Sequence, residues 1–238
     1  MKDSAFSDHY CVILTLVLGY WTPKDPTMKI SLLMTMLCVS SFGASITQMS
    51  AGGASIPDND PAGVSVDLIF VDARLITGNL SVTINSLLHT WIGDLSATLT
   101  HVGTGTTVSL FQRPGRTSSG SGCSAHFNGS YTFSDLGSST LGAVCPASGA
   151  DVPPGTFRAS ADIGASDELA VILGSAFNGQ SAGGTWRLFL SDQSGSDTGS
   201  FASWTLQADV APTASPEPAA LAMLATGLGF LALARRLR

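Results

Sequence analysis

Lysine is absent from the middle of this chain, between Ile46 and Val210, and charged residues make up only 12% of the 238 residues. In that segment five arginines stand against twelve aspartates and one glutamate, a formal net charge of −8. Nucleic acids and anionic lipids bind basic surfaces, so this deficit of cations argues against both as partners. An acidic domain of this kind fits cation binding, or solubility outside the cell.

The chain also has few of the Glu-, Lys-, Leu- and Ala-rich runs that helices favour, whereas Gly, Ser and Thr are abundant. Short apolar–polar alternations recur between glycine-containing turn signals, and such alternation is typical of half-buried strands. Only residues 162–173 have a debatable helical pattern. We therefore predict one all-β domain, an antiparallel β-sandwich. Its expected strands are 65–71, 80–85, 95–101, 107–111, 186–190 and 204–208.

The N-terminal part has the order of features of an export signal. Met28-Lys29 begins a basic region, residues 30–42 are apolar, and Gly43 and Ser45 have the spacing of a cleavage site. We predict an N-terminal signal helix within residues 1–45, which signal peptidase removes. The mature sandwich would then occupy residues 46–210.

A second apolar run, Cys11 to Tyr20, precedes this signal, and two such runs in tandem are unusual. We interpret Met28 as the true start of the protein and residues 1–27 as an upstream extension of the gene model. A longer signal region is the alternative.

The C-terminal part joins a proline-rich linker, residues 211–218, to an apolar run, residues 219–234, and a final group of arginines. An apolar helix followed by cations is typical of a transmembrane segment whose basic end lies in the cytoplasm. At about 1.5 Å per residue the run is shorter than the roughly 30 Å hydrocarbon core, which indicates a temporary anchor. Residues 219–238 are thus predicted to form a transmembrane helix and basic tail.

This tail closely resembles the PEP-CTERM sorting signal. In that family an exosortase recognises the tail and removes it, in bacteria that often make exopolysaccharide. The resemblance therefore implies an exosortase as a partner during export. The residues that carry it are Pro216, Glu217, Pro218, Arg235, Arg236 and Arg238.

Three separated clusters between Ile56 and Val210 occur in the order found in a known family. They lie in residues 89–95 (HTWIGDL), 177–188 and 192–206. Together they resemble the P domain (P/Homo B domain) that follows the catalytic domain of kexin- and furin-like subtilisin proteases. The resemblance implies a jelly-roll-like β-sandwich with an accessory role. The chain departs from the family at Ile92, where arginine is frequent, and in residues 117–150, an expected long loop.

Little in the sandwich points to catalysis. His89 and Asp94 are close enough to suggest a dyad, yet no serine lies in a Gly-x-Ser-x-Gly elbow. We interpret His89 as a histidine that is hydrogen-bonded to a carboxylate or a backbone group. No segment has room for a subtilisin-like domain, so we expect no enzyme and no catalytic residues.

The large aromatic residues have two interpretations. Trp186 and Trp204 lie at strand positions and are expected in the core. Trp91 or Tyr131 is the better candidate for stacking against a sugar.

Asp94, Asp192 and Asp197 lie near glycine-rich turns, where their carboxylates are candidate ligands of a structural calcium ion. The spacing does not match an EF-hand. The alternative is local Asx-turn hydrogen bonding, which uses aspartate beside glycine without any metal. Apart from calcium, no cofactor is expected.

Cysteine is scarce, and the sandwich contains only Cys123 and Cys145, which flank the expected long loop. An isolated pair in an exported domain most simply forms a disulfide. A metal site that combines Cys123 with His126 is the rival interpretation.

These features predict an exported, non-catalytic protein that is membrane-anchored until its tail is removed and then lies in the cell envelope or outside the cell. Its expected role is structural or binding, with exopolysaccharide as one candidate partner. The alternative is a regulator of a separately encoded, secreted subtilisin-like serine protease.

Overall fold

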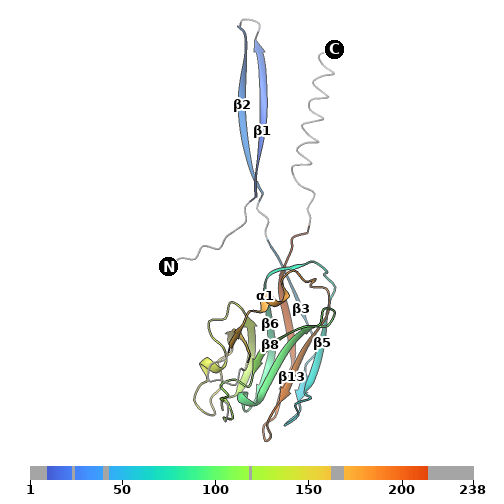
Figure 1. Ribbon diagram of the computed structural model, residues 1–238, viewed down its shortest axis with the longest axis vertical. Helices are drawn as coiled ribbons and strands as arrows, with labels where there is room; N and C mark the ends of the chain where they lie inside the picture. The colour runs from blue at the N-terminus through green and yellow to red at the C-terminus, as the bar shows by residue number, and fades with distance from the viewer. Residues whose placement is uncertain (1–9, 23–24, 40–42, 118–119, 162–168, 214–238) are drawn as a thin grey trace. The chain divides into compact units, whose positions relative to one another are not determined.

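The computed structural model describes residues 10–22, 25–39, 43–117, 120–161 and 169–213. The chain divides into two compact units, one that ends at Gly43 and one that begins at Ala44. The first unit contains an antiparallel hairpin of β1 (Tyr10–Thr22) and β2 (Asp25–Val39), which are the two blue strands of Figure 1. Its register places Cys11 opposite Cys38.

The described residues of this first unit are strands, whereas the sequence predicted a signal helix there. Two apolar runs of similar length satisfy each other's backbone N–H and C=O groups by pairing, which is the alternative to helical hydrogen bonding. The predicted export and cleavage depend on composition rather than on this conformation, and they stay predictions.

Within the described ranges, no helix is long and apolar enough to cross a membrane. The predicted transmembrane helix and basic tail, residues 219–238, lie outside the described residues. So do the sorting-signal residues Pro216, Glu217 and Pro218.

The second unit is a β-sandwich, which confirms the predicted all-β fold. In its larger sheet the long strand β6 pairs with β9 along one edge and with β15 and then β14 along the other. The strands of this sheet are β3 (Ala44–Met49), β4 (Ala54–Ile56), β6 (Ile76–His89), β9 (Phe127–Ser134), β10 (Gly155–Phe157), β14 (Gly199–Phe201) and β15 (Ser203–Val210).

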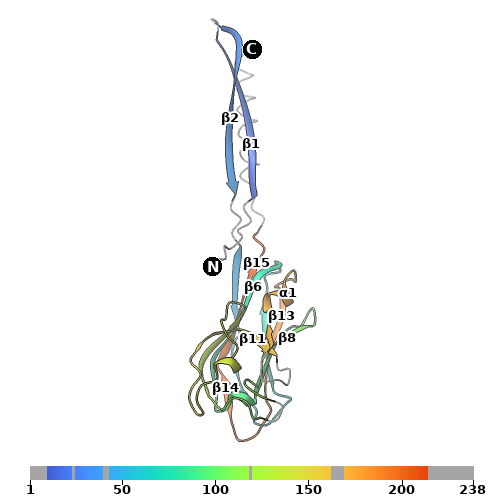
Figure 2. The same cartoon turned by 60° about the vertical axis from the view of Figure 1, so that its left-hand side comes forward.

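The facing sheet has four antiparallel strands in the order β5 (Val64–Phe70), β13 (Gly184–Asp192), β7 (Leu95–His101) and β8 (Thr106–Gln112). Figure 2 shows the two layers from the side, with β6 and β15 in one and β13 and β8 in the other. The smaller elements are the pair β11 (Ala159–Ala161) and β12 (Leu169–Val171), the helix α1 (Leu173–Phe177), and the 3₁₀ turns η1 (Ile92–Asp94) and η2 (Gly142–Val144).

The core lies between the two sheets, because every second side chain of each strand points inward. Trp186 on β13 and Trp204 on β15 are fully buried, as predicted. The indole Nε1 of Trp204 also donates a hydrogen bond to the Val66 carbonyl of β5, at 3.2 Å. This bond joins a strand of the larger sheet to a strand of the smaller one.

All six predicted strands are present, but the expected long loop, residues 117–150, is only partly a loop. It contains β9, which pairs with β6 and buries Phe127, Tyr131 and Phe133. Gly129, at an inward position between Phe127 and Tyr131, obscures the alternation in the sequence. Tyr131 is 0% exposed, so the interpretation of this residue as a sugar-stacking aromatic was wrong.

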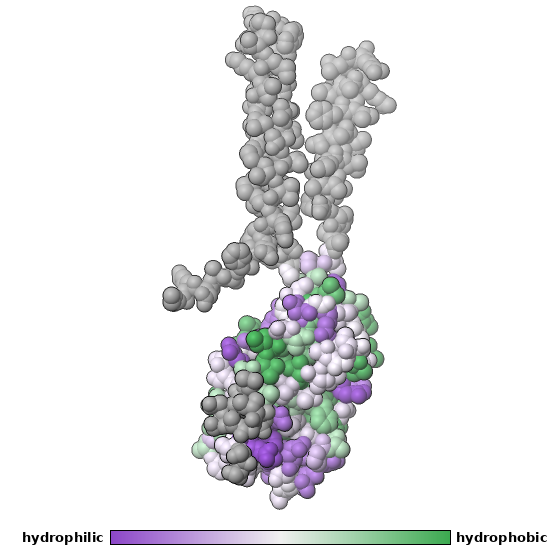
Figure 3. Space-filling model, in the orientation of Figure 1, coloured by the Kyte–Doolittle hydropathy of each residue, from purple (hydrophilic) through white to green (hydrophobic). Residues whose placement is uncertain are grey.

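The surface carries few strong charges. In Figure 3, pale residues near the middle of the hydropathy scale cover much of the visible face of the sandwich, with scattered hydrophobic and hydrophilic patches between them. This agrees with a chain that is rich in Gly, Ser and Thr and has only 12% charged residues.

Trp204 offers a test of how the two sheets are joined. We expect Trp204→Phe to lower the free energy of unfolding by about 1–3 kcal/mol, because the Val66 carbonyl loses its buried donor. Trp204→Ala should cost about 3–5 kcal/mol, since it also leaves a cavity. Gln207→Ala, at an exposed position of the same strand, is the control and should change stability by less than about 0.5 kcal/mol. Equal urea midpoints for Trp204→Phe and the wild type would contradict the inter-sheet bond.

Candidate functional site

The candidate site is a buried polar corner where β6 and β13 end. His89, the last residue of β6, places Nε2 3.1 Å from Oδ2 of Asp192, the last residue of β13. Both side chains are fully buried. Because β6 belongs to the larger sheet and β13 to the smaller, this pair connects the two layers of the sandwich.

A bulge in β6 turns His89 toward the core. Leu80, Val82 and Ile84 are buried at even positions, whereas Leu87 and His89 are buried at odd positions. The change coincides with a register shift against β9 and with Ser86, whose φ is +51°. An extra residue in a strand reverses which face the following side chains occupy. Without the bulge, His89 would point to solvent.

Both ring nitrogens of His89 are committed to the protein. Nε2 faces Asp192, while Nδ1 lies 2.9 Å from the carbonyl oxygen and 3.1 Å from the amide nitrogen of Trp91. A neutral ring accepts the Trp91 N–H, and a protonated ring donates to the Trp91 carbonyl. The predicted bonding of His89 to a carboxylate and a backbone group is confirmed. The carboxylate is that of Asp192, so the alternative dyad with Asp94 was wrong.

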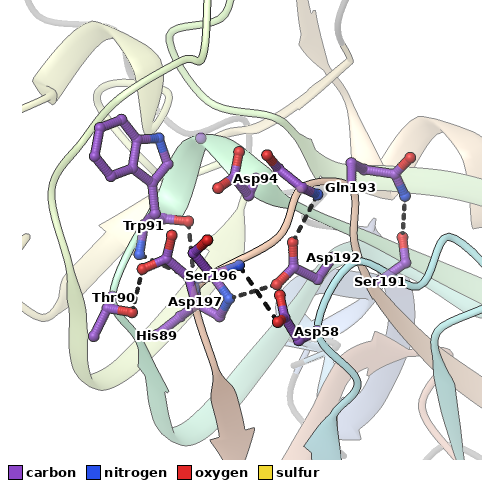
Figure 4. A network of polar contacts seen from close by, with 12 residues as sticks. Asp58, His89, Thr90, Trp91, Asp94, Ser191, Asp192, Gln193, Ser196 and Asp197 are labelled. Atoms are coloured by element: carbon purple, nitrogen blue, oxygen red, sulfur yellow. Dashed lines mark hydrogen bonds and ion pairs between the residues drawn. The ribbon is translucent and has the colours of Figure 1, made fainter.

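The aspartates around this pair combine one local bond with bonds to distant parts of the chain, and Figure 4 shows them from close by. Oδ1 of Asp192 accepts the Ser194 N–H at 3.0 Å, which confirms the Asx-turn alternative at this position. Oδ1 of Asp197 accepts the Thr90 hydroxyl at 2.6 Å. Both bonds tie the segment after β13 back to the corner.

Asp94 lies in η1, is 4% exposed and faces a cation. The Arg113 Nη2 is 3.3 Å from its Oδ1, and the Arg113 Nε donates to the Gly93 carbonyl at 3.0 Å. Burial raises the pKa of Asp94 above its usual value, and the carboxylate of Asp192 raises it further, while Arg113 opposes the shift.

The three aspartates of the calcium prediction thus have separate partners: Arg113 for Asp94, His89 for Asp192 and Thr90 for Asp197. In the described part of the chain, no group of three or more His, Cys, Asp or Glu side chains is placed to hold a metal ion. Calcium binding by Asp94, Asp192 and Asp197 stays a prediction without a preformed ligand group.

A disulfide-bonded loop covers the corner. Cys123 and Cys145 form the predicted disulfide, with Cα atoms 5.8 Å apart, so the rival metal site of Cys123 and His126 was wrong. The Gly93 N–H donates to the Cys123 carbonyl at 2.9 Å, and the Trp91 indole donates to the Ser121 carbonyl at 3.0 Å.

Only glycine fits where this loop crosses η1. A Cβ on Gly93 would lie 2.5 Å from the Ser121 oxygen and 2.6 Å from the Cys123 nitrogen. The sequence contained this signal, a glycine directly before Asp94, but nothing in it named the segment that packs there. Arg113 was not predicted as a site residue; it follows β8 and faces Asp94 because the antiparallel pairing brings the end of β8 beside the start of β7.

Two of the solved structures that match the chain resemble it only weakly. A chain in the crystal structure of the Aeromonas sobria serine protease with its chaperone has a TM-score of 0.42 and 14% identity. A chain in the crystal structure of the A. sobria serine protease has a TM-score of 0.39 and 17% identity. The matches cover 83% and 69% of this chain, which spans only 36% and 26% of the other two. No protein-family model and no curated protein match the chain.

The His89–Asp192 pair can be tested by a double-mutant cycle. We expect His89→Ala and Asp192→Ala each to lower the free energy of unfolding by about 3–5 kcal/mol, because each leaves a buried polar partner alone. The double variant should cost clearly less than the two added together. Asp197→Ala, at the more exposed bond to Thr90, is the control and should cost about 1 kcal/mol. Additive losses at His89 and Asp192 in urea unfolding would contradict a coupled pair.

Asp94 predicts a pH effect of defined sign. Its pKa is raised in the folded state, so between the ordinary aspartate pKa of 3.8 and the folded-state pKa the folded protein binds more protons than the unfolded one. Wild-type stability should therefore fall through this window as pH rises, relative to Asp94→Asn, which removes the titration. Asp67→Asn is the control, because Arg187 lowers the pKa of Asp67 and reverses the sign. Parallel stability curves for Asp94→Asn and the wild type from pH 3 to 8 would refute the assignment.

Proposed function

We propose that this protein is an exported, non-catalytic β-sandwich with a structural or binding role in the cell envelope or in extracellular polysaccharide. The observation that carries the proposal is the Cys123–Cys145 disulfide. Such bonds persist in oxidising compartments outside the cytoplasm. In the chain-entropy model this one contributes about 3 kcal/mol, since it closes a loop with a sequence separation of 22.

A structural use of the polar corner supports the non-catalytic part. A general base must reach a proton of its substrate. His89 and Asp192 are fully buried, and both ring nitrogens of His89 face the protein. The corner that most resembles a catalytic constellation in the sequence therefore holds two sheets together.

The route to the envelope rests on the sequence resemblances. A signal peptide delivers the chain, and an exosortase removes the tail that contains Pro216, Glu217 and Pro218. A second candidate role, as a partner of a separately encoded subtilisin-like protease, follows from the resemblance to the P domain. Here the structure adds one observation: the first and third of the resembling clusters meet at the corner, through His89 and Asp192.

Fractionation with intact-mass analysis of the native protein tests the proposal, in a wild-type bacterial host and in one that lacks its exosortase. We expect a mature species that starts near Ile46, ends near Pro216 and has Cys123 joined to Cys145. This species should appear only in the wild type. Co-purification of a protease with the mature species would select the second role.

A chain that keeps Arg238 in both strains, or two thiols open to alkylation, would overturn the proposed route. The disulfide has its own control. Replacement of both cysteines by serine should lower the free energy of unfolding by about 3 kcal/mol, and reduction of the wild type should cause the same loss.

A further inference from the structure

A cavity of about 360 Å³ is open on the outer face of the four-stranded sheet, beside the polar corner. Its floor is formed by outward-facing residues of three neighbouring strands, β13, β7 and β8. The volume is at the lower end of the range for small-molecule sites, about 300–1,000 Å³. The lining residues are Pro61, Ser96, Thr98, Ser109, Phe111, Gln112, Arg113, Arg116, Phe189, Ser191 and Gln193.

Arg116 stands out because, within the described residues, its guanidinium has neither an ion pair nor a hydrogen-bond partner at Nε. The sandwich has five arginines, and four of them have partners: Arg74 with Asp72, Arg113 with Asp94, Arg187 with Asp67, and Arg158 with the Gly137 carbonyl. The Nε of Arg116 is buried and, among the described residues, is the one buried side-chain nitrogen or oxygen without a hydrogen-bond partner. A buried donor of this kind costs free energy unless an acceptor reaches it.

The turn that presents Arg116 is held in place. The Arg116 N–H donates to the Arg113 carbonyl at 3.0 Å, and the Cys123 N–H donates to the Pro114 carbonyl at 2.8 Å. Arg113 itself has a φ of +45° and is anchored by its bonds to Gly93 and Asp94. The disulfide-bonded loop therefore fixes the backbone of the turn and the Arg113 side chain before any ligand arrives, which reduces the ordering cost of binding.

The rest of the lining suits a ligand that carries hydroxyl groups. Ser96 and Thr98 offer hydroxyls and Gln112 offers an amide, while the Ser109 hydroxyl already donates to the Ser160 carbonyl at 2.7 Å. The Gln193 amide donates to the Ser191 hydroxyl at 2.8 Å, so these two groups are paired with each other. No hydrogen bond of the described chain uses the Ser96 or Thr98 hydroxyl, so both can bond outward. Phe189, which is partly exposed, adds an apolar surface for the C–H face of a ring.

A peptide fits this site less well than a sugar. Two of the three floor strands, β13 and β7, are paired along both edges, so their backbone groups already belong to the ladder. An extended peptide cannot add to them as a strand. A strand added at the outer edge of β8 would extend the sheet and would not lie over the cavity on its face. Recognition has to come from side chains. Asp94 neutralises the charge of Arg113, so Arg116 supplies the remaining positive charge of the cavity lining. One such charge matches a ligand with a single negative charge.

We propose that this cavity binds a sugar unit that carries a carboxylate, such as a uronic acid, with the carboxylate at Arg116 and the ring hydroxyls along Ser96 and Thr98. The inference deepens the proposed binding role and rests on it, because it names the chemical class of the ligand. Uronic acids are constituents of acidic polysaccharides, so the site would attach the protein to such a polysaccharide through a single uronic acid unit.

The test is a chemical-shift titration of the purified, oxidised full chain, labelled with ¹⁵N, against three probes. Glucuronate and glucose differ in their carboxylate, while acetate has the carboxylate without the ring. We expect glucuronate to shift the amides of Thr98 and Gln193 and to bind about tenfold or more tightly than glucose or acetate. Arg116→Gln should remove this advantage, and Thr98→Val should weaken glucuronate several-fold.

Arg187→Gln is the matched control, because Arg187 lies on the outer face of β13, is paired with Asp67 and does not line the cavity. It should bind glucuronate like the wild type. The inference would be overturned if glucose or acetate bound as tightly as glucuronate. It would also be overturned if Arg116→Gln bound glucuronate as tightly as the wild type does. If the protein is exported and processed but does not bind glucuronate, the proposed ligand is wrong and the proposed export stands. If it binds glucuronate but is never exported, the proposed location is wrong and the proposed ligand stands.

Discussion

The buried pair of His89 and Asp192 is the contact on which the arrangement of the sandwich depends. The two residues end strands of different sheets, so their bond fixes where β6 stops relative to β13. A buried polar pair adds little net stability compared with apolar side chains, because both groups lose their hydration. Its effect is on specificity: a shift of either strand by one residue would turn its own polar side chain to the outer face and leave the partner buried and unpaired. The register of the two sheets at this end is therefore strongly constrained. Because the ends of both strands are fixed, the turns that follow them are fixed as well.

Those turns explain why the disulfide lies where it does. The segment after His89 forms η1, and Gly93 there allows the Cys123 segment to approach closely. The same segment bonds to Pro114, in the turn that carries Arg113 and Arg116. Corner, disulfide loop and arginine turn thus form one continuous hydrogen-bonded region. A covalent bond across the loop opposes fraying in a part of the chain with little regular secondary structure.

Local patterns were enough to predict the six main strands, the burial of both tryptophans and the disulfide, because alternation and cysteine pairing are short-range or countable signals. The site could be predicted only in part. His89 and three aspartates were candidates, but the partner of His89 depends on a bulge at Ser86, which reverses the face of β6 and leaves no clear mark in the sequence. β9 was missed because Gly129 takes one of its inward positions and leaves a gap in the apolar side of the alternation. Arg116 was invisible as a site residue, since its lack of a partner appears only once the other four arginines are placed.

The charge of the sandwich limits what the cavity can recognise. With five arginines against thirteen acidic residues, the long-range field repels polyanions, so electrostatic steering cannot bring an acidic ligand to the surface. Attraction has to act at contact, through the partly buried Arg116 guanidinium, whose hydrogen bonds to a carboxylate are short and directional. Such a site favours one carboxylate, held together with neutral hydroxyls, over a densely charged chain. A polysaccharide with carboxylates spaced by neutral groups meets this condition, whereas a nucleic acid, with a charge on every phosphate, does not.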